Sequence, residues 1–313
     1  MHDLNRLRVL RELKHRGTLA AVAAALCYSP SSVSHQLSQL ETEVGVPLLE
    51  RVGRRVRLTA HAEILVSHVE AVLERLERAD ADIATASTEL SGTLRMASFQ
   101  TAARAVVPAA ITLLRELHPK VRVHLTESEP RSALNALFAR DFDLVIAEEY
   151  PGNPYPRPPE VEQEVLCEDQ LRVAVPGNVR VRASADALET LRTLADHAWV
   201  MEPEGTAARQ WAISLCRSAG FEPDVRFDAT DIFLHRRLAE EGHAAAILPD
   251  LVWGGEAPTI ALRELPRGQR SRRIFTLVRS GRSTHPAVTA LRAALKQAVV
   301  ELQTANAAMR GTG

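Results

Sequence analysis

The sequence predicts an α/β protein with an all-α N-terminal part. Three observations predict this class. Residues 4–40 carry apolar side chains at helical spacing, residues 62–90 repeat them in an unbroken heptad pattern, and strand-like and helix-like segments alternate after Gly92. At 313 residues the chain is too long for one ordinary core, so we expect two or three domains.

The first forty residues predict three short helices. Leu4, Leu7, Leu10 and Leu13 share one helical face, and Gly17 ends that helix. An alanine-rich helix follows over Leu19–Leu26, and a third helix starts with Ser29 as its cap and Pro30 as its first residue. Two short helices joined by a tight turn form a helix-turn-helix, whose second helix can lie in a major groove of DNA.

The third helix carries the candidate base-reading residues. Its hydroxyl, imidazole and amide groups can donate to and accept from base edges, and its N-terminus favours phosphate. The candidates are Ser31, Ser32, Ser34, His35 and Gln36, whereas Val33 and Leu37 belong to the core. The alternative is that Ser29 caps the helix and the other serines are only solvated.

A small β-hairpin, or wing, is predicted next. Apolar residues flank a turn at Gly53-Arg54. The hairpin would bring four cations to backbone phosphate or to a narrow minor groove, namely Arg51, Arg54, Arg55 and Arg57. The alternative is a solvated turn, with Arg51 partly structural.

The net charge of −1 hides an asymmetry that fits a polyanion partner. Residues 1–60 hold nine Lys/Arg against five Asp/Glu, a net of +4, which leaves −5 for the rest of the chain. A basic head on an acidic body is typical of a local polyanion-binding unit.

A long helix is predicted from residue 62 onward, with no Gly or Pro before Gly92. Its heptad seam favours a coiled-coil-like dimer helix over a core helix. Pairing would supply a second head and an approximately palindromic operator. The seam consists of Leu65, Val69, Val72, Leu76, Ala79, Ile83, Ala86 and Leu90.

The remaining chain predicts mostly parallel sheets. Strands are expected at 93–97, 121–126, 144–147, 171–175, 199–201 and 245–248. Helices are expected at 103–117, 131–140, 207–219, 232–241 and 286–302, followed by a frayed tail. Chain crossings near residues 166–170 and 266–273 would divide this body into two lobes with a cleft.

Composition and motifs exclude several classes of protein. The chain is 46% hydrophobic and 25% charged, with neither an apolar run of membrane-spanning length nor a signal-peptide core, so we expect a cytoplasmic protein without a membrane partner. Cys27, Cys167 and Cys216 lack metal-ligand or disulfide spacing. No GxGxxG, Walker, HExxH or GxSxG motif occurs, so no catalytic residue, metal or cofactor is predicted.

The sequence resembles the LysR-type transcriptional regulators over roughly residues 4–300. The resemblance is carried by Ala20-Ala21, Leu26, the stretch 29–37, Leu40-Glu41, Gly45, the stretch 48–51, Leu58-Thr59, the stretch 142–146 and the stretch 241–249. The chain has Pro30 where the family often has Gln and His35 where it often has Arg. Both are expected DNA-contact positions, so these departures affect the base preference. Leu49 and Ala62 stand where Phe and Gly are usual.

The resemblance implies a winged helix-turn-helix over residues 1–60, a linker helix over 61–91, and a two-lobed, periplasmic-binding-protein-like effector domain over 92–313. The lobes would span about 92–166 plus 270–302, and 167–269. The implied effector-binding residues are Ser98, Gln100, Thr101, Glu129, Thr206 and Thr230. Helix starts near Thr101 and Thr206 suit a carboxylate, and acids at Glu129, Glu148, Glu202 and Glu204 suit an amino group, so an amino-acid-like or otherwise cationic effector is expected.

The function implied by the resemblance is a regulator that binds double-stranded DNA as a homodimer or homotetramer and responds to a small-molecule effector. The alternative is a metabolic enzyme with an appended DNA-binding head. A nonspecific nucleoid protein would not need the large α/β body, and an exported solute-binding protein would not carry residues 1–90.

Overall fold

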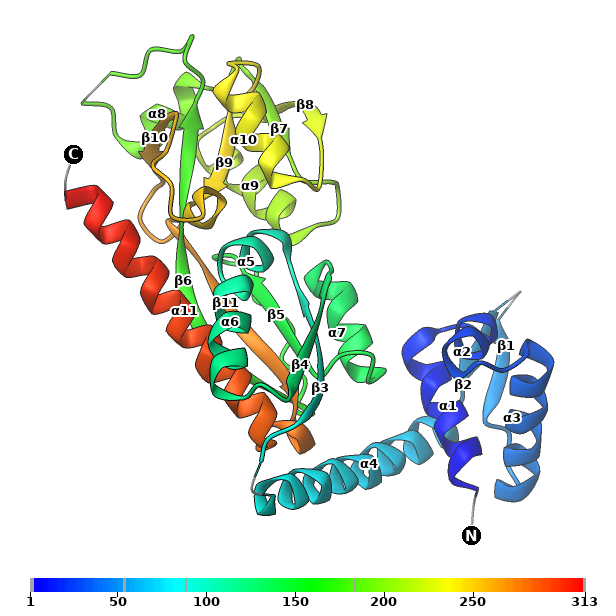
Figure 1. The fold of residues 1–313 in the computed structure, drawn as a ribbon. Coiled ribbons are helices and arrows are strands. Elements are labelled where there is room, and N and C mark those ends of the chain that lie inside the picture. Colours follow the sequence, from blue (N-terminus) through cyan, green and yellow to red (C-terminus); the bar gives the residue numbers. More distant parts are fainter. Residues whose placement is uncertain (1–2, 53–54, 88, 183, 312–313) are drawn as a thin grey trace.

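The computed structural model describes residues 3–52, 55–87, 89–182 and 184–311. A small N-terminal head is joined by one long helix to a larger two-lobed body (Figure 1). Among the described residues, no helix combines the length and the hydropathy that a membrane span requires.

The head contains three helices and a hairpin: α1 (Leu4–Arg16), α2 (Leu19–Leu26), α3 (Pro30–Val44), β1 (Leu49–Val52) and β2 (Arg55–Leu58). Each helix begins where the sequence predicts, because Asp3, Thr18 and Ser29 accept backbone N–H groups of the first turn. Glycines in the left-handed region end α1 and α3. The apolar faces meet in one core, which includes Leu10, Val33, Leu37, Leu40 and Leu48.

Helix α4 (Ala60–Ala86) leaves the head and reaches the body. Thr59 caps its N-terminus. The predicted seam is shorter than expected, since the helix ends at Ala86 and Leu90 packs against the core of the body. Most of the remaining seam is unburied in the single chain: Val72, Leu76 and Ile83 are about half or more exposed.

The body is built on a seven-stranded sheet with two crossing strands. Strand β6 (Val161–Val175) pairs with β11 (Ser271–Arg279) through residues 161–170, and with β9 and β10 through residues 171–175. One lobe therefore continues into the other along β6. The sheet order is β10 (Ala261–Glu264), β6, β11, β5 (Leu144–Glu149), β3 (Gly92–Ser98), β4 (Val121–Glu127), with β9 (Ala246–Pro249) beside β6.

The expectation of mostly parallel sheets is wrong for the crossing strands. Strands β3, β4 and β5 are parallel, as are β7 (Ala198–Met201) and β8 (Asp224–Asp228), but β6 is antiparallel to β9, β10 and β11. The sheet is mixed because β6 runs through both lobes and β11 lies antiparallel between β5 and β6.

Helices cover both lobes. One core forms around α6 (Val107–Leu117), α11 (Pro286–Gly311) and the central strands, and it includes Met96, Leu114, Leu291 and Leu295. A separate core around Trp199 and Trp211 fills the other lobe. The helices are α5 (Gln100–Ala105), α6 (Val107–Leu117), α7 (Pro130–Phe138), α8 (Ala187–Thr193), α9 (Ala207–Ser218), α10 (Ile232–Glu240), α11 (Pro286–Gly311) and the short η1 (Asp250–Trp253) and η2 (Ser280–Arg282).

Two helix predictions need correction. The helix expected over 103–117 is broken at Val106, because Pro108 lacks the N–H that a continuous helix would need and begins a new helix instead. The tail expected to fray after residue 302 continues as helix α11 to Gly311.

Candidate nucleic-acid interface and ligand pocket

Helix α3 places its polar residues as a reading surface requires. Ser31, Ser34 and His35 are exposed, and Ser32 and Gln36 are half-buried. Ser29 Oγ accepts the N–H of Ser32 at 3.1 Å, so the cap is formed by Ser29 and the later serine hydroxyls are not needed for it. The surface can therefore present hydroxyl, imidazole and amide groups to a partner.

Gln39 belongs to the same surface and was missed from the sequence. Its amide nitrogen lies 2.9 Å from Nε2 of His35, one turn earlier on α3. The four-residue spacing between a histidine and a glutamine on one helix was the available signal.

The predicted hairpin forms, with Glu50 opposite Arg57 and Val52 opposite Arg55. Arg57 is exposed, and its Nε donates to Oε1 of Glu50 at 2.7 Å, so phosphate would have to compete with this carboxylate. Arg54 and the side chains of Arg51 and Arg55 lie outside the described residues, and their role stays a prediction.

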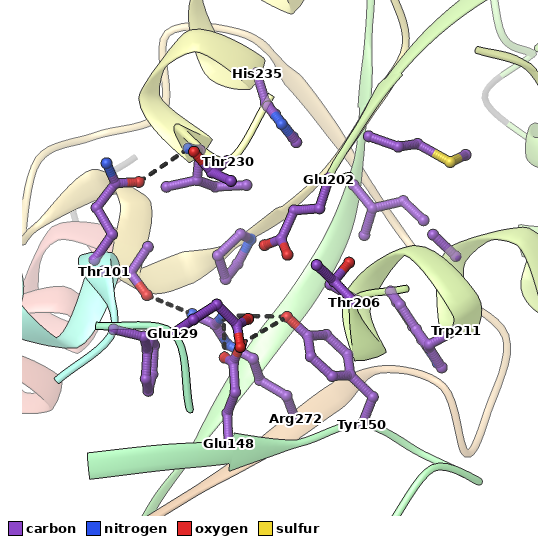
Figure 2. Close-up of a pocket in the computed structure, with 18 of the residues that line it drawn as sticks. Thr101, Glu129, Glu148, Tyr150, Glu202, Thr206, Trp211, Thr230, His235 and Arg272 are labelled. Carbon is purple, nitrogen blue, oxygen red and sulfur yellow. Dashed lines mark hydrogen bonds and ion pairs between the residues drawn. The ribbon is translucent and has the colours of Figure 1, made fainter. Parts of the chain in front are cut away.

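A pocket of about 310 Å³ lies between the two lobes (Figure 2). Five of the six predicted effector-binding residues line it: Gln100, Thr101, Glu129, Thr206 and Thr230. Ser98 does not. Its side chain is fully buried, and its hydroxyl donates to the carbonyl of Phe99 at 3.1 Å. Of the four acids expected at the mouth, Glu129, Glu148 and Glu202 line the pocket, whereas Glu204 is exposed outside it.

Arg272 on β11 is the central charge of the pocket and was missed from the sequence. Its guanidinium donates to Oδ2 of Asp169 and to the hydroxyl of Thr101, both at 2.7 Å, and it also contacts Glu148. Burial lowers the pKa of Arg272, but the carboxylates of Glu148 and Asp169 outweigh it and hold that pKa well above its ordinary value. Its partners lie far away in the sequence, so only the folded sheet reveals this residue.

At the edge of the pocket, Gln100 of one lobe forms hydrogen bonds to the other lobe. Its amide nitrogen donates to Oδ1 of Asp231 at 3.1 Å, and its amide oxygen accepts the N–H of Ile232 at 3.0 Å. Asp231 caps α10 in the other lobe. Movement of one lobe relative to the other would stretch these bonds, so the hydrogen bonds of Gln100 depend on how far the two lobes are closed.

Two helix starts at the pocket, those of α7 and α9, are occupied by the protein's own side-chain oxygens, whereas the start of α5 at Gln100 and Thr101 has no side-chain cap. Glu129 accepts the N–H of Arg131 at the start of α7, and Thr206 accepts the N–H of Arg209 at the start of α9. The hydroxyl of Thr206 donates in turn to the carbonyl of Pro203. Of the two helix starts at which a carboxylate is expected, the one at Thr206 is therefore filled from within, and the one near Thr101 is not.

Besides Arg272, four titratable groups of the pocket wall have displaced pKa values, and burial raises those of Glu148 and Tyr150. Burial, helped by the nearby charges of Glu148 and Glu129, raises the pKa of Glu202 to about 7. Burial lowers the pKa of His235, whose Nε2 lies 2.8 Å from the carbonyl oxygen of Ala229. Glu202 therefore titrates near neutral pH, and burial favours the uncharged form of His235.

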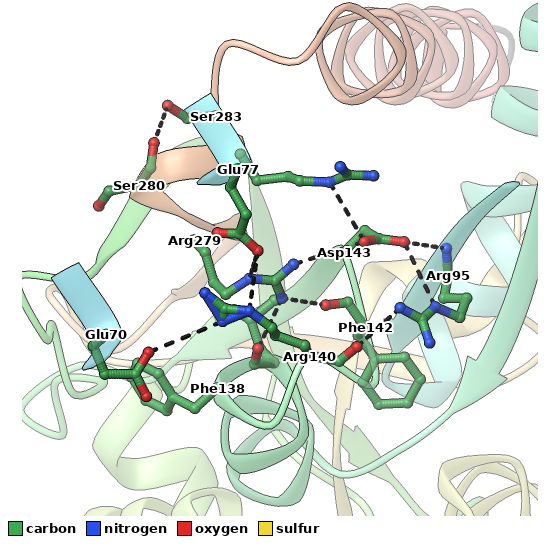
Figure 3. A network of polar contacts seen from close by, with 12 residues as sticks. Glu70, Glu77, Arg95, Phe138, Arg140, Phe142, Asp143, Arg279, Ser280 and Ser283 are labelled. Atoms are coloured by element: carbon green, nitrogen blue, oxygen red, sulfur yellow. Dashed lines mark hydrogen bonds and ion pairs between the residues drawn. The ribbon is translucent and has the colours of Figure 1, made fainter. Parts of the chain in front are cut away.

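A polar network joins the head and α4 to the body, and Figure 3 shows its contacts between α4 and the body. Glu70 of α4 accepts from Nε of Arg11 at 2.6 Å and lies near Arg140 of the body. Two turns further along α4, Glu77 accepts from Nε of Arg279 at 2.8 Å. Arg11 also donates to the carbonyl oxygen of Phe138, whose ring stacks on that of His15. Buried charges of this kind fix one arrangement of head, helix and body.

Comparison with known proteins matches both parts of the chain. A family described as "LysR substrate binding domain" matches residues 87–300, and one described as "Bacterial regulatory helix-turn-helix protein, lysR family" matches residues 4–63. The transcriptional dual regulator GltC of Bacillus subtilis is 25% identical over 272 residues, which cover 86% of this chain and 89% of GltC.

Solved structures share the fold at full length. A full-length OxyR variant from Pseudomonas aeruginosa superposes with a TM-score of 0.68 at 20% identity, covering 95% of each chain. Full-length CbnR complexed with its target DNA gives a TM-score of 0.52 at 21% identity, covering 95% of this chain and 100% of CbnR.

Proposed function

The chain belongs to the LysR family of transcriptional regulators, and we propose that its outward face of α3 reads an operator while a small molecule in the pocket between the lobes modulates the complex. The observation that carries the proposal is the combination, in one chain, of a polar recognition helix with a ligand-sized pocket. Such pockets, apolar with a few convergent polar groups, are typical of small-molecule sites.

We further propose the division of labour along the chain. Residues 1–60 bind DNA, residues 61–91 pair two chains, and residues 92–313 hold the effector, with lobes of about 92–166 plus 270–302 and 167–269. The lobe boundaries are supported by β6, whose residues 161–170 pair with β11 in one lobe and whose residues 171–174 pair with β9 in the other. A DNA partner places the protein in the cytoplasm.

Oligomerisation is supported by the unburied apolar stripe of α4. Val72, Leu76 and Ile83 are spaced by steps of four and seven residues, and burying them requires a partner. A second copy is the partner of matching periodicity, and two heads would occupy two half-sites. The alternative to a homodimer is a homotetramer assembled from two such dimers, as the resemblance to the family implies.

We propose regulation and not catalysis for the pocket. GltC of Bacillus subtilis, which is 25% identical to this chain over 272 residues, is a transcriptional regulator. A thiol-based response at Cys167 or Cys216 is also not supported, because burial raises the pKa of each to about 12, which keeps both as thiols.

The DNA surface is tested by separating charge from base reading. In a dimer, Arg54→Ala with Arg55→Ala removes up to four phosphate contacts. A plot of the logarithm of the DNA-binding constant against the logarithm of the salt concentration should therefore become less steep by about 4, on every DNA sequence. The matched control is Arg263→Ala with Arg267→Ala, two exposed arginines of the body. Ser34→Ala or His35→Ala should instead reduce discrimination between the operator found by footprinting and random DNA, by about 1–3 kcal/mol. An unchanged salt slope for the Arg54/Arg55 variant would remove the wing from the interface.

A further inference from the structure

We propose that the pocket between the lobes takes an organic cation, an ammonium or guanidinium group carried on an apolar body. The inference rests on the proposed function, because it names the chemical class of the effector.

The charges that line the pocket are predominantly negative. The described residues of its wall include one guanidinium, that of Arg272, and four carboxylates: Glu127, Glu129, Glu148 and Glu202. The acids come from both lobes. A ligand that bridges the lobes therefore meets carboxylates on either side (Figure 2).

The single guanidinium is not available to an anion. Arg272 donates to Asp169, Glu148 and Thr101. Its guanidinium carbon, Cζ, lies 5.1 Å from the ring centre of Phe99. Asp169 stands behind it and is 4% exposed. A carboxylate ligand would have to displace a buried carboxylate that is already hydrogen-bonded, which is strongly unfavourable.

Two of the helix starts at the pocket, those of α7 and α10, do not offer an anion site either. Glu129 and Asp231 place their own carboxylates on the first N–H groups of α7 and α10. The partial positive charge of those helix starts is therefore neutralised within the protein. Glu129 also lines the pocket, so it turns a helix start that could attract anions into a negative surface.

The rest of the wall suits an apolar body. Tyr150 and Trp211 face each other with ring centres 5.2 Å apart, and Met201, Leu171 and Ile247 complete the lining. Aromatic faces attract cations as well as burying apolar area. The volume of about 310 Å³ fits a small amine or guanidine with a short alkyl or aryl chain.

Because Glu202 titrates near pH 7, the pH dependence of ligand affinity reveals the sign of the ligand's charge. It faces Glu148, Glu129 and Arg272, with Glu127, Tyr150 and His235 also on the pocket wall. Since the pKa of Glu202 is about 7, a cation binds best to its ionised form and releases a proton on binding at lower pH. Affinity for a cation should therefore fall as the pH drops below 7, and affinity for an anion should rise.

The experiment compares matched probes on the full-length protein. Calorimetric titration would use arylalkyl and alkyl amines, such as 2-phenylethylamine and agmatine, beside the carboxylates and alcohols of the same skeletons, such as 3-phenylpropanoate and 2-phenylethanol. We expect the amines to bind at least tenfold more tightly than their carboxylate and alcohol counterparts at pH 8, and to lose that preference at pH 6.

Variants identify the pocket as the site. Glu129→Gln with Glu202→Gln should weaken amine binding at least tenfold and abolish its pH dependence, while Glu204→Gln, which changes an exposed acid outside the pocket, should leave both unchanged. Tighter binding of the carboxylates, equal binding of amines and alcohols, or an amine preference that survives the double substitution would overturn the inference.

Operator binding in the presence of the same probes separates this inference from the proposed function. If carboxylates and not amines change the footprint, the ligand class is wrong and the regulatory function stands. If amines bind the pocket with the expected pH dependence but no probe changes DNA binding, the cation site stands and the regulatory function is wrong.

Discussion

At Arg272 a single side chain holds together segments that are distant in the sequence. Thr101, Glu148 and Asp169 all contact its guanidinium, and each belongs to a different element around the pocket. Buried charges contribute little net stability as a group, but removing one partner leaves the others unpaired. The stability of the pocket therefore depends on the set and not on one bond.

This dependence predicts a non-additive mutant pair. Arg272→Met leaves Asp169 and Glu148 buried without their cation, so the free energy of unfolding should fall by about 3–5 kcal/mol. Adding Asp169→Asn removes one of the stranded charges and should restore part of that loss. Urea unfolding of the two variants and of Asp169→Asn alone measures the coupling. Strict additivity would show that the contacts do not form one unit.

Glu202 predicts how the stability of the free protein depends on pH. Its pKa is raised from 4.5 in the unfolded chain to about 7 in the fold, so the folded state binds the proton more tightly. The associated stability is fully present below pH 4.5 and is lost as the pH rises through 7, with a maximum loss of about 3 kcal/mol. Compared with Glu202→Gln, the wild type should become less stable between pH 5 and pH 8 in thermal unfolding. A constant difference between the two proteins would contradict the assigned pKa.

The sequence predicted pocket residues where chemistry follows local structure. Thr101, Glu129 and Thr206 were found because they stand at or near helix starts, where polar groups gather. Arg272 could not be found this way, because it lies 171 residues after its partner Thr101 and only the sheet brings them together. Ser98 was wrongly expected to line the pocket. Successive side chains of a strand point to opposite faces of the sheet, so an error of one residue in the strand places a side chain on the wrong face.

Elements were predicted best where local rules govern them. Helices α1 and α2 have the predicted bounds because their caps and glycines are local signals. The break at Val106 was missed although Pro108 signals it. The antiparallel crossing by β6 could not be predicted, since strand direction in a sheet is set by partners far away in the chain.

Helix α4 carries a prediction of its own about assembly. Leu76 is 55% exposed in the single chain and lies in the middle of the apolar stripe. Leu76→Glu would place two like charges in a paired helix, so the protein should dissociate to monomers at micromolar concentration in sedimentation experiments. Leu234→Glu, a control on α10 where the leucine is 43% exposed, should not change the sedimentation coefficient. A wild-type protein that is already monomeric would exclude α4 as the dimer helix.

For the whole molecule, the decisive question is how pocket and head communicate. The body contacts α4 through η2 and through the ion pair of Arg279 with Glu77, and β11 carries both Arg272 in the pocket and Arg279 at this contact. A rigid strand therefore connects the ligand site to the helix that holds the DNA-binding head. A change in lobe closure at one end of β11 can reach α4 at the other.

Gly281 allows that connection to be cut without removing a charge. A Cβ at this position would lie 2.6 Å from the backbone oxygen of Glu74 and 3.0 Å from its Cα, and neither backbone atom of a helix can yield easily. Gly281→Ala should therefore push η2 away from α4, loosen the Arg279–Glu77 pair and speed amide exchange in residues 72–80 on the order of tenfold. Gly177→Ala is the matched control, because its Cβ would meet no atom within 4 Å and its backbone is not left-handed. Since the clash lies outside the pocket, Gly281→Ala should leave small-molecule affinity unchanged while abolishing the effect of that molecule on operator binding. If the two glycine variants exchange alike and respond alike, the contact between η2 and α4 does not transmit the signal.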